Sequence, residues 1–205
     1  ADGLRLEGAT SGRFDLPASD HARDLELDEN TVVILAMKTG DTAAALDTHL
    51  ELYAGLPIVC SQNGVTNEQL VLDRDLAPYG CTVMVGAAIH EPGLVWHSGG
   101  ELLSLGVWPT GTDDVVDDVV ADLVAGSMKA RGHADIRSNK WGKLVRNLAN
   151  AYLALTDLSV QEASCAEADR FFIADVQEEA LDALDAAGIE IESIGRRSPR
   201  EQVEN

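Results

Sequence analysis

The sequence predicts an α/β protein in which a doubly wound, mainly parallel sheet is followed by a region built only of helices. In the first half, continuous apolar runs rich in β-branched residues alternate with helical patterns, which is typical of parallel strands buried on both faces. From Thr112 onward, apolar residues recur only at helical spacing. The change of pattern near residues 107–112 predicts two domains, residues 1–110 and 111–205.

The first domain is expected to hold three buried strands, at residues 31–37 (TVVILAM), 57–61 (PIVCS) and 81–89. Residues 93–97 and 102–107 then resemble an antiparallel hairpin across the turn SGGE. Helical patterns separate the strands. They cover residues 41–54, with Asp41 or Thr42 as the N-cap, and residues 67–76.

The second domain begins with residues 113–130, where apolar residues at helical spacing follow acidic residues suited to a helix N-terminus. Further helices are expected over residues 138–155 and 160–187. The tail, residues 193–205, is polar and shows no pattern of a packed element.

Composition limits the classes of partner. The 205 residues include 15 basic and 35 acidic side chains, a formal net charge of −20, which repels nucleic acid and anionic membranes. We therefore expect neither as a partner. The acidity fits two hypotheses, a salt-adapted protein whose carboxylates hold hydrated cations, or an ordinary acidic protein from a GC-rich genome.

Cysteines and histidines give no sign of a metal site or a disulfide framework. The three cysteines are scattered, and Cys60 and Cys81 lie in apolar strand-like runs typical of buried thiols. The five histidines show no HxH or HxxxH spacing. We expect a reducing, cytoplasmic setting and no bound metal.

A helix is predicted over residues 138–155, and two lines of side chains run along its surface. One line is apolar and is expected to face the core, consisting of Trp141, Leu144, Leu148, Ala151 and Leu155. Lys143, Asn147 and Asn150 share a second line, at about 0°, 40° and −20° on the helical wheel. Asparagine is unfavourable inside helices, so this line is expected to border a cleft. The alternative is a solvated face.

Polar residues also follow the first two buried strands. Lys38 and Thr39 come directly after residues 31–37, and Asn63 and Gly64 follow residues 57–61. Ligands of open α/β sheets bind outside the carboxyl ends of the strands, where a lysine reaches phosphate or ribose oxygens. The alternatives are a snorkelling lysine and a turn that needs Asn and Gly only for its backbone conformation.

These segments together resemble the ketopantoate reductase family, the NADPH-dependent 2-dehydropantoate 2-reductases. The resemblance rests on VVILAMKT, QNGVTNE, VGAAIHEPGLVWHSGGELLSLG and KWGKLVRNLANAYLAL, and runs through most of residues 31–160. It implies a partial Rossmann-like domain and a helical domain of the 6-phosphogluconate dehydrogenase-like type. It also implies NADP as cofactor, a 2-oxo acid as substrate, a role in pantothenate and coenzyme A biosynthesis, and a possible homodimer.

The resemblance assigns roles to individual residues. Lys143 matches the lysine that protonates the substrate carbonyl, and Asn147 matches a substrate-binding asparagine. Asn150 is the candidate for the second asparagine, although the family places it one residue later, where this chain has Ala151. Lys38 and Asn63 match residues that contact the cofactor. Lys140 has no counterpart in the pattern.

The chain also departs from the family, because it contains no GxGxxG turn, the usual pyrophosphate site. We expect it to be part of a longer reductase and to be inactive by itself. Two alternatives stay open: a reductase of another 2-oxo acid, and a non-catalytic nucleotide-binding protein.

Overall fold

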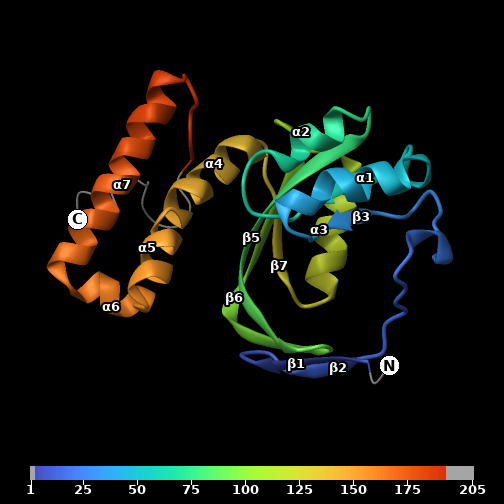
Figure 1. Ribbon diagram of the computed structural model, residues 1–205. Coiled ribbons are helices and arrows are strands. Elements are labelled where there is room, and N and C mark those ends of the chain that lie inside the picture. The colour runs from blue at the N-terminus through green and yellow to red at the C-terminus, as the bar shows by residue number, and fades with distance from the viewer. Residues whose placement is uncertain (1–2, 193–205) are drawn as a thin grey trace.

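The computed structural model describes residues 3–192 and confirms the predicted fold class, a mixed α/β arrangement of a curled sheet followed by helices (Figure 1). The seven-stranded sheet has the order β2-β1-β6-β5-β4-β3, and β7 also pairs with β6. The strands are β1 (Leu4–Gly8), β2 (Gly12–Phe14), β3 (Val33–Leu35), β4 (Pro57–Cys60), β5 (Ala77–Glu91), β6 (Leu94–Val107) and β7 (Lys129–Gly132). The predicted polar tail, residues 193–205, lies outside the described residues.

Helices are interspersed with the strands up to Gly132, and the described elements after it are all helices. The helices are α1 (Thr39–Tyr53), α2 (Asn67–Leu72), α3 (Asp114–Ala125), α4 (Ile136–Asn147), α5 (Ala149–Thr156), α6 (Val160–Cys165) and α7 (Glu167–Ala186), with a short 3-10 helix η1 at Ala22–Asp24. Among residues 3–192, no helix is both long enough and apolar enough to span a membrane.

The sheet is covered by helices on both faces, as a doubly wound fold requires. Strands β3, β4 and β5 are parallel, and successive side chains of a strand point to opposite faces. In β4, Ile58 and Cys60 pack in a core with residues of α1 and α2, whereas Val59 belongs to a second core that includes Val116 of α3. Helices α1 and α2 therefore cover one face, and α3 covers the other.

Two predictions about the strands were wrong. The hairpin expected across SGGE is a continuous strand β6, which pairs antiparallel with β5 and follows the turn at residues 92–93. Gly99 and Gly100 have φ values of 135° and 75°, but they lie at an irregularity of the ladder. Glycine with positive φ is common to turns and to bulges, so the sequence pattern was misleading. Strand β3 is also shorter than predicted, and Ile34 is 55% exposed rather than buried.

The expectation of helices only after Thr112 was wrong as well. Helix α3 ends at Ala125, followed by Gly126 and by Ser127 with a positive φ of 68°. The chain then forms β7, which runs parallel to β6. Helix α3 and β7 thus complete the sheet-based unit, although both lie beyond residue 110. The division into two domains stays a proposal.

Helices α4 to α7 extend from the sheet on one side (Figure 1). The predicted helix over residues 138–155 is divided at Leu148 into α4 and α5, and the one over residues 160–187 is divided at Ala166 into α6 and α7. The predicted apolar stripe is not the buried line. Val145 packs against Leu181 and Leu184 of α7, whereas Leu155 is 88% exposed.

Candidate functional site

A cleft of about 890 Å³ opens where β3 and β4 end beside α4 and α5. All five residues selected from the sequence, namely Lys38, Asn63, Lys143, Asn147 and Asn150, line it. The rest of the lining comes from residues 36, 37, 39, 41, 61, 62 and 83–86. The strand-end rule and the second line of the predicted helix therefore converge on one place, while the role of each residue stays a proposal.

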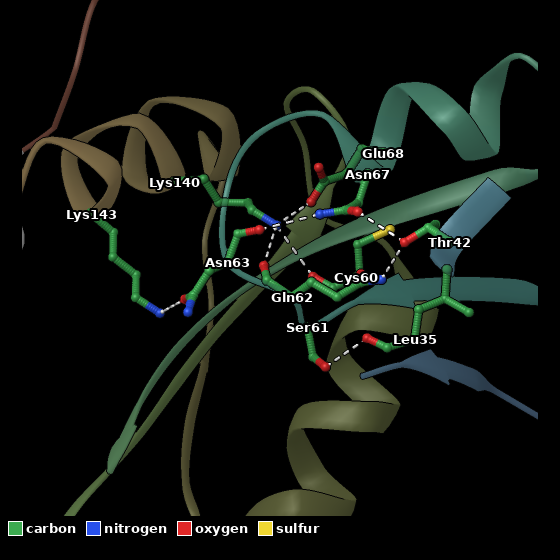
Figure 2. A network of polar contacts seen from close by, with 10 residues as sticks. All are labelled: Leu35, Thr42, Cys60, Ser61, Gln62, Asn63, Asn67, Glu68, Lys140 and Lys143. Carbon is green, nitrogen blue, oxygen red and sulfur yellow. Dashed lines mark hydrogen bonds and ion pairs between the residues drawn. The ribbon is translucent and has the colours of Figure 1, made fainter. Parts of the chain in front are cut away.

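Lys143 is held in the cleft by two oxygen acceptors. Its Nζ donates to Oδ1 of Asn63 at 2.8 Å and to the backbone oxygen of Val83 at 2.5 Å (Figure 2 shows the contact with Asn63). An ammonium group has three N–H donors. The third is therefore the one that can meet a ligand oxygen in the cleft.

The surroundings of Lys143 lower the pKa of its ammonium group. Burial lowers the pKa of this ammonium below its ordinary value of 10.5, and repulsion from the nearby Lys140 and Arg146 acts in the same direction. A lysine with a lowered pKa gives up its proton more readily near neutral pH. Lys143 is thus suited to donate a proton to an oxygen that gains negative charge.

Asn63 is presented to Lys143 by a turn with buried supports. Gly64 adopts a φ of 91°, which favours glycine, and Nδ2 of the buried Asn67 donates to the Asn63 carbonyl at 3.3 Å. The Asn67 amide oxygen in turn accepts from Thr42 Oγ1 at 3.1 Å. Thr42 is therefore an interior contact of α1. The prediction that Asp41 or Thr42 caps this helix was wrong, because the N-cap is Lys38.

The N-terminus of α1 forms one wall of the cleft through Lys38 and Thr39. Lys38 makes no side-chain capping hydrogen bond, and the first N–H groups of a helix have no acceptor within that helix. Such an N-terminus beside a lysine favours anions. This set of donors fits the phosphate or ribose oxygens of a nucleotide.

The structure assigns Lys140 a place that the sequence did not predict. Lys140 is buried, and its ammonium contacts Glu68 and two backbone oxygens of the β4 end (Figure 2). Nothing in the chain pattern links Glu68 to Lys140, which lie 72 positions apart. The only signal available was the spacing of Lys140 and Lys143, three residues apart on one helix, which places them on neighbouring lines.

Comparisons with known proteins agree with the nucleotide-binding geometry of the cleft. The family described as ketopantoate reductase PanE/ApbA matches residues 1–110, which is more than half of the 205 residues. The chain belongs to the ketopantoate reductase family. The chain is 30% identical over 166 residues to a 2-dehydropantoate 2-reductase of Halobacterium salinarum, covering 77% of this chain and 53% of the relative.

A 2-dehydropantoate 2-reductase of Pyrococcus horikoshii is 26% identical over 147 residues, with 72% of this chain and 48% of the relative covered. The chain thus spans about half the length of these curated relatives. Among solved structures, a PanE/ApbA family ketopantoate reductase from Ralstonia eutropha has a TM-score of 0.77 and 25% identity, covering 94% of this chain and 63% of the other. A ternary structure of D-mandelate dehydrogenase, at 17% identity, shares the fold with a TM-score of 0.79, covering 98% and 64%.

Proposed function

We propose that this ketopantoate reductase chain provides the lysine and amide side of an active site that reduces a 2-oxo acid with NADPH, the substrate being 2-dehydropantoate and the product pantoate. One observation carries the proposal. The Lys143 ammonium has one N–H donor left for a ligand, and it lines the same cleft as Asn147 and Asn150. The names of the curated relatives support the choice of substrate.

The cofactor proposal rests on the other wall of the cleft. Lys38 and the N-terminus of α1 are suited to oxygens of a nucleotide, and Asn63, which lines the same cleft, accepts a hydrogen bond from Lys143. A structural neighbour, D-mandelate dehydrogenase, was solved with NADH. NADPH bound along this wall supplies the hydride, and the protein contributes orientation and a proton donor.

The residues of this chain then act on the substrate oxygen. The third N–H of Lys143 donates to the carbonyl oxygen and stabilises the negative charge that develops there. As the proton moves to this oxygen, Lys143 becomes a neutral amine, which still has two N–H groups for Asn63 and Val83. The amides of Asn147 and Asn150 lie on the same wall and orient the polar groups of the substrate.

The test uses the intact protein that contains this chain. Reduction of 2-dehydropantoate, 2-oxoisovalerate and phenylglyoxylate is followed by loss of NADPH absorbance, and each cofactor is titrated by fluorescence. We expect 2-dehydropantoate to have the highest kcat/KM and NADPH to bind more tightly than NADH. A higher kcat/KM for another acid would move the assignment to a different 2-oxo acid reductase.

Two further outcomes would change the proposal. Cofactor binding without turnover of any 2-oxo acid would support the non-catalytic nucleotide-binding alternative. Equal affinity for NADPH and NADH would contradict the cofactor assignment.

We also propose a homodimer, since a dimeric ketopantoate reductase from Staphylococcus aureus is among the structural neighbours. Light scattering of the intact protein checks this, and a monomeric mass would contradict it.

A further inference from the structure

Lys140 and Glu68 form a buried ion pair beside the cleft. The Lys140 side chain is 3% exposed and the Glu68 side chain is fully buried. Besides Glu68, the Lys140 ammonium donates to the backbone oxygens of Cys60 and Gln62, each at 3.3 Å (Figure 2). Its three N–H donors therefore have three acceptors. The pair joins α4, α2 and the end of β4.

Stability alone is a weak reason for such a pair. Removing two charges from water costs free energy that their mutual attraction often fails to offset, and apolar side chains of similar volume usually stabilise as well or better. The second oxygen of the Glu68 carboxylate is buried without a hydrogen-bond partner among the described residues. The pair is thus poorly optimised for stability, which points to a role in placing something else.

The Lys140–Glu68 pair lies close to Asn63, the residue that binds the Lys143 ammonium. Gln62, whose carbonyl accepts from Lys140, directly precedes Asn63, whose amide oxygen accepts from Lys143. Two lysines that lie three residues apart on α4 thus bind the same loop. The Lys140 ammonium binds the backbone carbonyl of Gln62, and the Lys143 ammonium binds the side chain of Asn63. If the backbone at Gln62 moves, Asn63 moves with it and Lys143 loses one of its two fixed acceptors.

We propose that Lys140, paired with Glu68, is a positioning residue that fixes the turn at Gln62 and Asn63 against α4 and so aims the Lys143 ammonium into the cleft. This inference rests on the proposed function and deepens it. Lys140 also acts on Lys143 through charge, because its repulsion is the second cause, after burial, that lowers the pKa of Lys143.

The first test measures Lys143 itself and needs no turnover. In the intact protein, competitive labelling with acetic anhydride across pH, read by mass spectrometry, gives the pH midpoint at which Lys143 becomes a free amine. Lys140→Met should raise this midpoint, because it removes the repulsion of Lys140 and leaves the Glu68 charge uncompensated. Lys129→Met is the matched control, since Lys129 pairs with Glu101 on an exposed surface, and it should leave the midpoint unchanged.

The second test separates positioning from stability with Lys140→Met and the double variant Lys140→Met/Glu68→Met. The double variant removes both charges, so it should unfold at a temperature closer to wild type than the single variant. We expect kcat to stay about 10²-fold low in both variants, as is typical when reacting groups are displaced by about 1 Å. The KM for NADPH should change less than kcat.

The outcomes are distinct. A double variant that regains both stability and wild-type kcat would show that the pair is only structural and would overturn the inference. An unchanged Lys143 midpoint in a folded Lys140→Met variant would overturn it too. If the wild-type protein reduces no 2-oxo acid, the proposed function fails, while the labelling result still decides whether Lys140 controls Lys143.

Discussion

Replacing Lys143 by alanine tests the centre of the proposed site. The substitution removes the donor that faces the cleft and the two contacts to Asn63 and Val83. Because a proton donor and a charge near the carbonyl oxygen disappear together, the chemical step should suffer most. Cofactor binding should suffer less, since Lys38 and the N-terminus of α1, the other donors proposed to hold the cofactor, remain in the cleft lining.

The expected magnitudes separate catalysis from stability. Loss of a positioned acid lowers kcat by roughly 10² to 10⁴-fold, which corresponds to about 2.7–5.5 kcal/mol in the activation free energy. The two lost hydrogen bonds contribute about 1 kcal/mol each to folding. Relief of the burial of a charged group and of repulsion from Lys140 offsets part of this. The unfolding free energy should therefore fall by less than about 2 kcal/mol.

The assay is steady-state turnover of the intact protein with NADPH and 2-dehydropantoate, with thermal unfolding measured alongside. Arg137→Ala is the matched control, because Arg137 is an exposed cation on the same helix, and its kcat should equal that of wild type. Lys140 does not serve as a control, since it is buried beside the cleft. A folded Lys143→Ala protein whose kcat falls by less than about tenfold would refute the role of Lys143.

The pH dependence of wild-type turnover tests the same reasoning. Lys143 must carry a proton to donate one, and its pKa is lowered mainly by burial. The kcat should therefore begin to decline, as pH rises, below the ordinary lysine value of 10.5. A kcat that stays constant up to that value would contradict the lowered pKa.

The remaining predictions concern stability. Asp113→Ala should lower the unfolding free energy in urea by about 1–3 kcal/mol without changing kcat, because Asp113 caps α3 and accepts from Tyr79; an unchanged midpoint would contradict this. Burial raises the pKa of the Cys60 thiol from 9.0 to about 12, so the unfolded state ionises first and stability should fall as pH rises through that window. Cys60→Ala should flatten this alkaline decline, and an identical slope would oppose the assignment. If the net charge of −20 reflects salt adaptation, unfolding should require more urea toward molar KCl, whereas a flat response favours an ordinary acidic protein.

Much of the site was predictable because two local rules apply to it. A helix repeats every 3.6 residues, so Lys143, Asn147 and Asn150 were expected on one line, and all three line the cleft. Parallel strands bring their carboxyl ends to one edge, so Lys38 and Asn63 were expected to meet there. The interruption at Leu148 changed the helix bounds but left these residues on the cleft.

Other features were decided by contacts between distant segments. The apolar spacing of residues 113–130 is helical, yet Lys129–Gly132 forms β7 because β6 offers it a partner. Strand propensity depends strongly on such context. In the same way, SGGE has the composition of a turn but lies within β6, since the pairing with β5 continues past it.

The sequence by itself determined the alternation of strands and helices, the buried thiols Cys60 and Cys81 and the lysine and amide line, because each depends on short-range periodicity or on solvation of single residues. Only the tertiary structure decided that Lys140 is buried with Glu68 and that Lys143 meets Asn63 and Val83. These contacts join α4 to segments 60 to 80 positions away. The burial and partners of a charged side chain follow from how elements pack, which no local pattern along the chain encodes.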